Sequence, residues 1–166
     1  MDRGKEMKLQ KLLIGLLLSA LGALAMAQPE DASLRKEMET YFAKADRLIE
    51  SNSSQVWTLF HPGYTAVDTE GKRMTLAEFK QMMASHMSTM KMVDMQMNVK
   101  HVRRGINEAY VWIEQIAKYK EKKNGRWVEM KMTSRWAETL VKGDTGWKFM
   151  YSQELPTSEP WPFKVG

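Results

Sequence analysis

The residues with the most distinctive chemistry in this sequence are methionines gathered around one histidine. Thioether sulfur and imidazole suit Cu(I), so a dense group of them supports a copper site as one interpretation. The same spacing also places these methionines on one side of a helix and on one face of a strand, where methionine is an adaptable core residue. Both interpretations stay open at this point. The group comprises Met74, Met82, Met83, His86, Met87, Met90, Met92, Met95 and Met97.

Several other kinds of chemistry are excluded by what the sequence lacks. The chain has no cysteine, which removes disulfides, zinc–thiolate sites and cysteine nucleophiles. His61 and His101 have no carboxylate or second histidine at ligand spacing, and no Ser/His/Asp set, phosphate loop or zinc motif occurs. The formal net charge is +5, but the basic residues form no stripe interleaved with aromatic residues. We therefore expect no nucleic-acid partner. The leading interpretation includes no cofactor and no bound metal.

The first 27 residues have the order of a secretory signal peptide. Three lysines precede an apolar run over residues 12–18, and small residues then lead to Ala25-Met26-Ala27. The stretch over residues 12–27 is at the short limit for spanning a bilayer, so a retained anchor is the alternative. We expect cleavage after Ala27 and a periplasmic or secreted protein with no membrane contact after cleavage.

The rest of the chain predicts one domain over residues 28–155 and a proline-rich tail over residues 156–166. The domain centres on residues 127–154, whose two alternating arms and intervening turn predict a long β-hairpin. On the second arm, alternation places Trp147, Phe149 and Tyr151 on one face and Lys148 and Ser152 on the other. Neighbours on a strand point to opposite faces, so only one of Arg135 and Trp136 can face the interior. The sequence does not decide which one does.

The segments before this hairpin alternate between helical and strand patterns. Apolar spacing predicts a helix that follows an N-cap at Ser33 and reaches Ile49, and the capping box of Thr75 and Glu78 opens another. Alternation over residues 92–102, and apolar residues on both faces over residues 108–120, predict two more strands. Helices gathered on one face of a curved antiparallel sheet give an α+β architecture.

This order of elements resembles the nuclear transport factor 2-like superfamily, and within it the SnoaL-like or ketosteroid-isomerase-like branch. The resemblance rests on the segments YFAKAD, VWTLFHPGYTAVDTEG, TLAEF and SRWAETLVKGDTGWKFMYSQE, which fall within residues 34–155. It implies a cone-shaped, cystatin-like sheet wrapped around N-terminal helices, a pocket at the open end, and a homodimer. The superfamily includes isomerases, cyclases, dehydratases and proteins that only bind or scaffold, so the fold leaves the function open.

The ketosteroid-isomerase-like branch implies one catalytic hypothesis. It places a general-base aspartate in a strand–Asp–x–x–Gly setting, which Asp68 resembles, and a hydrogen-bonding tyrosine on the first helix, where Tyr41 stands. Such a pair moves a proton next to a carbonyl and holds the developing oxyanion. Glu138 is the nearest candidate for a third, buried acid. The alternative is that Asp68 opens a turn and Tyr41 is a core residue.

The SnoaL-like resemblance also implies polar pocket positions at Arg135 and Gln153. With Glu114 on the neighbouring strand, they would form a polar cluster in an apolar and aromatic wall, which is typical of small-molecule sites. The alternative is an Arg135–Glu114 ion pair on a solvated face. The expected wall comprises Trp57, Phe60, Tyr64, Met87, Trp112 and Trp136.

The leading hypothesis is therefore an exported, homodimeric domain that binds a small apolar or amphipathic molecule without catalysis. One alternative is an isomerase, cyclase or dehydratase that uses Asp68 and Tyr41. Another is a periplasmic scaffold or a methionine-rich copper-binding protein. The sequence alone does not name the ligand.

Overall fold

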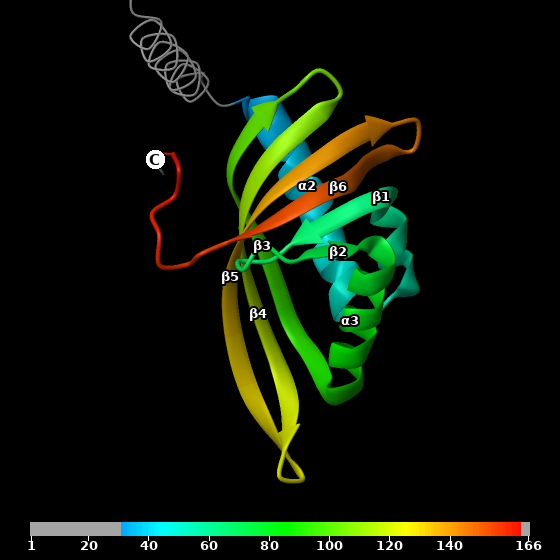
Figure 1. Cartoon of the computed structure of the whole chain (residues 1–166), viewed down its shortest axis with the longest axis vertical. Helices are drawn as coiled ribbons and strands as arrows, with labels where there is room; N and C mark the ends of the chain where they lie inside the picture. The colour runs from blue at the N-terminus through cyan, green and yellow to red at the C-terminus, as the bar shows by residue number, and fades with distance from the viewer. Residues whose placement is uncertain (1–30, 164–166) are drawn as a thin grey trace, which may run out of the picture. The chain divides into compact units, whose positions relative to one another are not determined.

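A six-stranded sheet with the strand order β2-β1-β6-β5-β4-β3 forms the frame of the structure (Figure 1). The computed structural model describes residues 31–163, so the expected signal peptide lies outside the described residues. The helical elements are α2 (Ala32–Glu50), the 3-10 helix η1 (Ser54–Leu59) and α3 (Leu76–Thr89). The strands are β1 (Phe60–Val67), β2 (Arg73–Thr75), β3 (Met90–Arg104), β4 (Glu108–Lys123), β5 (Arg126–Gly143) and β6 (Gly146–Leu155).

The sheet is mixed, which corrects the expectation of an antiparallel sheet throughout. Strands β1 and β6 run parallel, while the other neighbouring pairs are antiparallel. A parallel pair needs a long crossover connection, and here that connection contains α3 and the strands β2 to β5. The predicted α+β class is confirmed by this arrangement of helices and sheet.

Helix α2 packs against the sheet through a stripe of buried residues at helical spacing. Its buried residues are Leu34, Met38, Phe42 and Ala45. The helix begins earlier than predicted, because the N-cap is Asp31 rather than Ser33. The Asp31 carboxylate accepts a hydrogen bond from the Leu34 backbone N–H at 2.8 Å and also pairs with Arg104 at 2.6 Å. A carboxylate with both partners satisfies the free N–H and fixes the helix end to β3.

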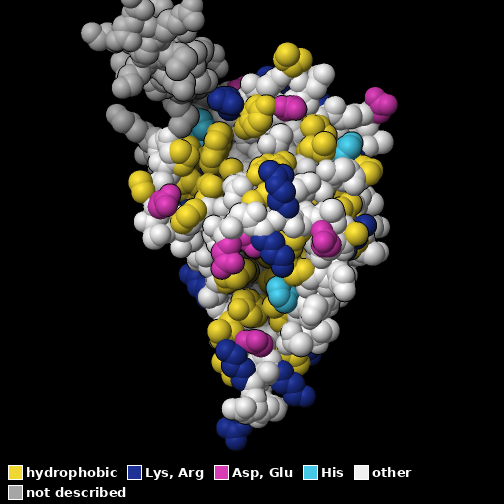
Figure 2. All heavy atoms as spheres, in the orientation of Figure 1, with side chains coloured by type: hydrophobic (Ala, Val, Ile, Leu, Met, Phe, Trp, Pro, Cys, Tyr) yellow, Lys and Arg dark blue, Asp and Glu magenta, His cyan; other side chains and the backbone are white. Residues whose placement is uncertain are grey.

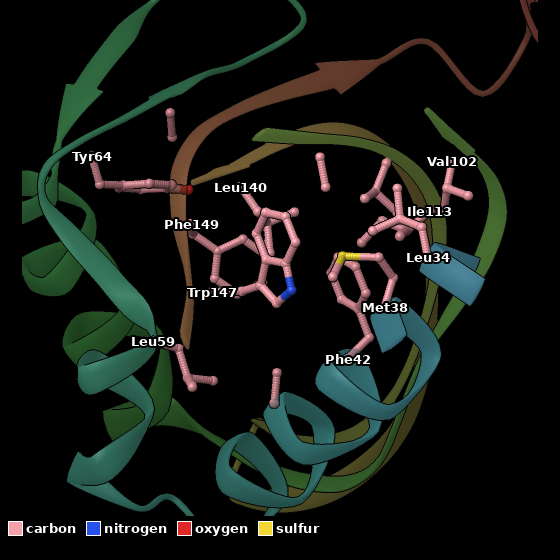
Figure 3. Close-up of a cluster of buried hydrophobic side chains, with 14 residues drawn as sticks. Leu34, Met38, Phe42, Leu59, Tyr64, Val102, Ile113, Leu140, Trp147 and Phe149 are labelled. Carbon is pink, nitrogen blue, oxygen red and sulfur yellow. The ribbon is translucent and has the colours of Figure 1, made fainter. Parts of the chain in front are cut away.

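The main core lies between α2 and the sheet. Figure 3 shows the sheet curving around α2, with side chains of both elements pointing toward one another. Trp147 is a packing residue here, 7% exposed, and its indole N–H donates to Glu37 at 2.8 Å. The labelled side chains of this core are Leu34, Met38, Phe42, Leu59, Tyr64, Val102, Ile113, Leu140, Trp147 and Phe149.

Helix α3 begins at the predicted capping box. The Glu78 carboxylate accepts from the Thr75 backbone N–H at 2.7 Å, and the Thr75 hydroxyl accepts from the Glu78 backbone N–H at 3.4 Å. No residue of α3, all of which the structure describes, is buried. The apolar side of α3 is therefore not closed against the core in the way that α2 is.

The hairpin of β4 and β5 extends to a tight turn at Asn124-Gly125, where both residues have positive φ, 49° and 78°. This is the backbone that the Asn-Gly pair favours. Figure 2 shows Lys and Arg side chains gathered at this tip, where Lys122, Lys123 and Arg126 are exposed.

None of the helices within residues 31–163 is long and apolar enough to cross a membrane.

Candidate functional site

A cavity of about 730 Å³ lies among α2, η1, α3 and the sheet. Its size falls in the range of small-molecule sites. Most of the lining is apolar, and the aromatic part comes from η1, β1, α3, β5 and β6 together. Helix α3 forms one side of the cavity, and none of its residues is buried. The aromatic residues that line it are Trp57, Phe60, Tyr64, Phe79, Trp136 and Phe149.

The strand register decides which of two neighbours on β5 faces this cavity. Trp136 is opposite Ile113 of β4, which is buried in the core, and Trp136 lines the cavity. Arg135 is opposite Glu114 and therefore lies on the outer face of the sheet. There its guanidinium donates to the Glu159 carbonyl at 2.6 Å and lies 4.6 Å from the centroid of the Trp161 ring.

A chain of three polar side chains reaches this apolar cavity from three strands. The Tyr64 hydroxyl donates to Ser152 Oγ at 2.8 Å, and the Ser152 hydroxyl donates to Glu138 Oε2 at 2.5 Å. Glu138 is two residues beyond Trp136 on β5, so both side chains lie on the same face, and Ser152 is directly opposite Glu138 on β6. Glu138 is 7% exposed and lines the cavity.

Burial controls the charge of this chain. Burial raises the pKa of the Glu138 carboxyl to about 8, against the smaller lowering effect of the Ser152 hydrogen bond. At neutral pH the carboxyl is therefore mostly protonated. Burial, and then the negative potential of Glu138, raise the pKa of the Tyr41 and Tyr64 hydroxyls, so both remain neutral.

Asp68 lines the same cavity from the end of β1. Its Oδ1 accepts hydrogen bonds from the backbone N–H of Glu70 at 3.0 Å and of Lys72 at 2.8 Å. The side chain therefore holds the turn that follows β1, in which Gly71 has a φ of 83°. Asp68 combines a turn-forming oxygen with a position at the cavity wall.

The arrangement of the elements is shared by proteins of known structure. No protein-family model and no curated protein matches the sequence. A candidate Ca/calmodulin-dependent kinase II association domain from Exiguobacterium sibiricum aligns with a TM-score of 0.59 at 12% identity, over 80% of this chain and 100% of that one. An NTF2-like protein with a cystatin-like fold from Novosphingobium aromaticivorans aligns with a TM-score of 0.57 at 12% identity, over 87% of this chain and 90% of that one.

This chain has the NTF2-like fold. A ketosteroid isomerase-like protein from Erwinia carotovora is also similar, with a TM-score of 0.50 at 18% identity, over 70% of this chain and 87% of that one. The sequence resemblance to the superfamily and the predicted cystatin-like architecture are thereby confirmed at the level of the fold. At these identities the comparisons say nothing about what the NTF2-like domain binds.

Tyr41 lies at a different place in the NTF2-like domain from Asp68. The Tyr41 hydroxyl donates to the Leu59 carbonyl at 3.0 Å, and its ring contacts Phe42 and Phe149 with centroid distances of 5.9 and 5.3 Å. Among the described residues, Tyr41 is not part of the cavity lining. The carboxyl groups that line the cavity alongside Asp68 are those of Glu138 and Glu154.

Four predicted pocket residues lie away from the cavity. Trp112, Glu114 and Arg135 are on the outer face, because they alternate with the inward-facing residues of β4 and β5. Glu114 pairs with Lys100 at 3.0 Å instead of with Arg135. Gln153 donates to the Asp68 carbonyl at 3.2 Å and so supports the end of β1. The predicted pocket residues that do line the cavity are Trp57, Phe60, Tyr64, Met87 and Trp136.

The tail covers part of the outer face. Phe163 stacks on His101 with a centroid distance of 4.7 Å and meets the edge of Trp112 at 5.6 Å. Trp161 stacks on Phe163 at 5.4 Å. The predicted proline-rich tail thus packs its two aromatic residues on the face opposite the cavity.

Most of the methionine group converges on the cavity. Helix α3 and strand β3 present their methionines from two sides, and Met132 of β5 joins them, whereas Met90 and Met92 are not part of the lining. Within residues 31–163 no three His, Asp or Glu side chains are placed to hold a metal ion. The sulfur-bearing residues of the lining are Met74, Met82, Met83, Met87, Met95, Met97 and Met132, with His86 beside them.

Sequence reasoning missed Ser152 because of a bulge. Alternation on the second arm of the hairpin put Trp147, Phe149 and Tyr151 on one face and Ser152 on the other. The register shifts between Thr139 and Leu140, so Leu140 is opposite Phe149 while Thr139 is opposite Tyr151. The extra residue, Met150, moves Ser152 to the same face as Phe149. No signal in the sequence locates this bulge.

Proposed function

We propose that this NTF2-like domain binds a small, largely apolar molecule in the cavity between α3 and the sheet. The observation that carries the proposal is a cavity of about 730 Å³ with an aromatic wall and the buried polar chain of Tyr64, Ser152 and Glu138. Sites of this kind gain affinity from the apolar wall, at about 25 cal/mol for each Å² buried. A few polar groups then fix the orientation of the ligand.

The methionines of α3 also fit this function. Met82, Met83 and Met87 on α3 face the cavity without being buried. Unbranched thioether side chains adapt their shape, and flexible methionine surfaces accept apolar partners of different outline. The side of the cavity formed by α3 therefore adjusts to the ligand, while the sheet side holds Glu138 in place.

Binding of the neutral, apolar dye Nile red tests this function. We expect saturable binding to the wild type, and about tenfold weaker binding to Trp136→Ala, because an aromatic contact of the wall is lost. Trp112→Ala is the matched control, since Trp112 lies on the outer face, and it should bind Nile red as the wild type does. Absence of saturable binding to the wild type, or equal weakening by both variants, would contradict the proposal.

We also propose export and a homodimer, which rest on residues 1–27 and on the resemblance to the superfamily. Native mass spectrometry of the protein purified from its own host tests both together. An exported protein should begin at Gln28, and a homodimer should have twice the mass of that chain. Any retained small molecule would appear as a further mass that is lost on denaturation. A chain that keeps residues 1–27, or a monomer at micromolar concentration, would contradict the respective proposal.

A proton-transfer enzyme is the second candidate, favoured by one observation. Asp68 and Glu138 line the same cavity, and a carboxylate with a protonated acid is a pairing used for proton abstraction next to a carbonyl. The test is exchange of the α-protons of the probe ketone β-tetralone in D₂O. If the protein is such an enzyme, exchange should be faster with the wild type than with Asp68→Asn. Equal exchange rates would contradict catalysis by Asp68, and ligand binding would remain as the proposed function.

A further inference from the structure

Glu138 is an acid without a cationic partner. Its carboxyl is bonded to Ser152, and no Lys, Arg or His in the described part of the chain forms an ion pair with it. An ionised carboxylate at a buried position is costly unless it is paired. A glutamine could keep the bond to Ser152 without that cost. A buried acid without a cationic partner in a cavity therefore marks a candidate functional group.

The hydrogen-bond chain around Glu138 ends on its carboxyl as the acceptor. Tyr64 donates to Ser152, and Ser152 donates to Glu138, so both hydroxyl protons are directed toward the carboxyl. Donors aimed at a carboxyl favour its negative form. The Tyr41 hydroxyl from α2 and the Tyr64 hydroxyl from β1 feel the potential of this carboxyl, and both are neutral. Lys72, Lys80 and His86 also line the cavity, and among the described residues none of them forms an ion pair with Glu138. A positive charge on the ligand would complete this arrangement.

The cavity wall suits a cation as well. The faces of aromatic rings attract ammonium groups, and the attraction is stronger where water is excluded. One ring of the lining already attracts such a group, because the Lys80 ammonium lies 5.4 Å from the centroid of the Trp57 ring. Trp136 lies on the same face of β5 as Glu138 and lines the cavity with it.

We propose that the ligand of this cavity is a hydrophobic amine, whose ammonium pairs with the Glu138 carboxylate while its apolar body contacts the aromatic and methionine wall. The inference rests on the proposed binding function and narrows its ligand class. On binding, the Glu138 proton leaves to solvent, and the carboxylate and the ammonium neutralise each other. A neutral ligand would make a hydrogen bond to Glu138 but no use of its charge.

A matched pair of probes tests the inference. Phenylbutylamine and phenylbutanol share the same apolar body and differ in the charge of the head group. We expect the wild type to bind the amine about tenfold or more tightly than the alcohol, as a charge-assisted bond supported by aromatic rings requires. Glu138→Gln should lose this preference. Glu114→Gln, a change at the outer face where Glu114 pairs with Lys100, should keep it.

Proton release gives a second readout. Calorimetry at pH 7 in two buffers of different ionisation enthalpy should show release of protons with the amine and none with the alcohol, and Glu138→Gln should abolish the release. Equal affinities for the two probes, or a preference for the amine that survives Glu138→Gln, would overturn the inference while Nile red binding upholds the cavity function. If neither the two probes nor Nile red bind, both the inference and the proposed binding function are contradicted.

Discussion

Glu138 and Ser152 lie opposite each other on β5 and β6, with Ser152 Oγ 2.5 Å from Glu138 Oε2 at the wall of a mostly apolar cavity. The pair exists because the bulge at Met150 returns Ser152 to the cavity face.

The stability of the protein should fall as the pH rises through the titration range of Glu138. The pKa is raised from 4.5 to about 8 in the folded state, so protonation of Glu138 contributes fully below about pH 4.5 and the contribution is lost as the pH approaches and passes 8. Glu138→Gln should therefore be more stable than the wild type at pH 9, by roughly 1–3 kcal/mol. Urea unfolding at several pH values measures the difference. A variant that is less stable than the wild type at pH 9 would contradict the assignment.

Asp46 should carry a second, smaller pH effect. Its Oδ2 accepts from the Met97 backbone N–H at 3.2 Å, whereas Oδ1 is buried without a hydrogen-bond partner among the described residues. Burial raises its pKa from 3.8 to about 6, so its protonation stabilises the fold below about pH 4 and this contribution is lost as the pH rises through 6. Asp46→Asn should stabilise the protein at pH 7 by about 1 kcal/mol.

The control for this prediction is another aspartate near β3. Asp94 pairs with Lys118 at 3.0 Å on the surface, and Asp94→Asn should change the free energy of unfolding by less than about 0.5 kcal/mol. The comparison of the two variants by urea unfolding at pH 4 and pH 7 separates burial from charge. If Asp46→Asn raises the free energy of unfolding no more at pH 7 than at pH 4, the prediction of a buried, unpaired oxygen is contradicted.

Tyr64 and Ser152 should be energetically coupled. Ser152→Ala removes the acceptor of the Tyr64 hydroxyl and the donor to Glu138, and should destabilise the protein by about 1–3 kcal/mol because buried polar groups are left unpaired. Once Tyr64 is phenylalanine, the same change should cost less. A double-mutant cycle by urea unfolding should give a coupling energy on the order of 1 kcal/mol. Additive effects would show that the chain does not act as a unit.

The tail should contribute to stability but not to binding. Trp161 and Phe163 cover Arg135, His101 and Trp112 on the outer face. Replacing both tail residues with alanine should lower the free energy of unfolding by about 1–2 kcal/mol, because aromatic and cation–π contacts are lost. Nile red affinity should stay as in the wild type. A change in Nile red affinity would mean that the tail acts on the cavity after all.

The sequence by itself determined the local features of this protein. The capping box at Thr75 and the alternation that separates Arg135 from Trp136 follow from neighbours a few residues apart, and both are present in the structure. The first helix begins two residues earlier than predicted, at an Asp31 cap that also pairs with Arg104 of a distant strand. The resemblance of several short segments was enough to predict the fold.

The tertiary structure alone decided which residues meet at the site. Alternation has two equivalent phases, and only the pairing of Trp136 with the buried Ile113 selects the one that turns Arg135 outward. The Met150 bulge is a mismatch between two strands, so no single strand encodes it, yet it brings Ser152 to Glu138. The pKa of Glu138 follows in turn, because burial is a property of the assembled sheet and not of the local sequence.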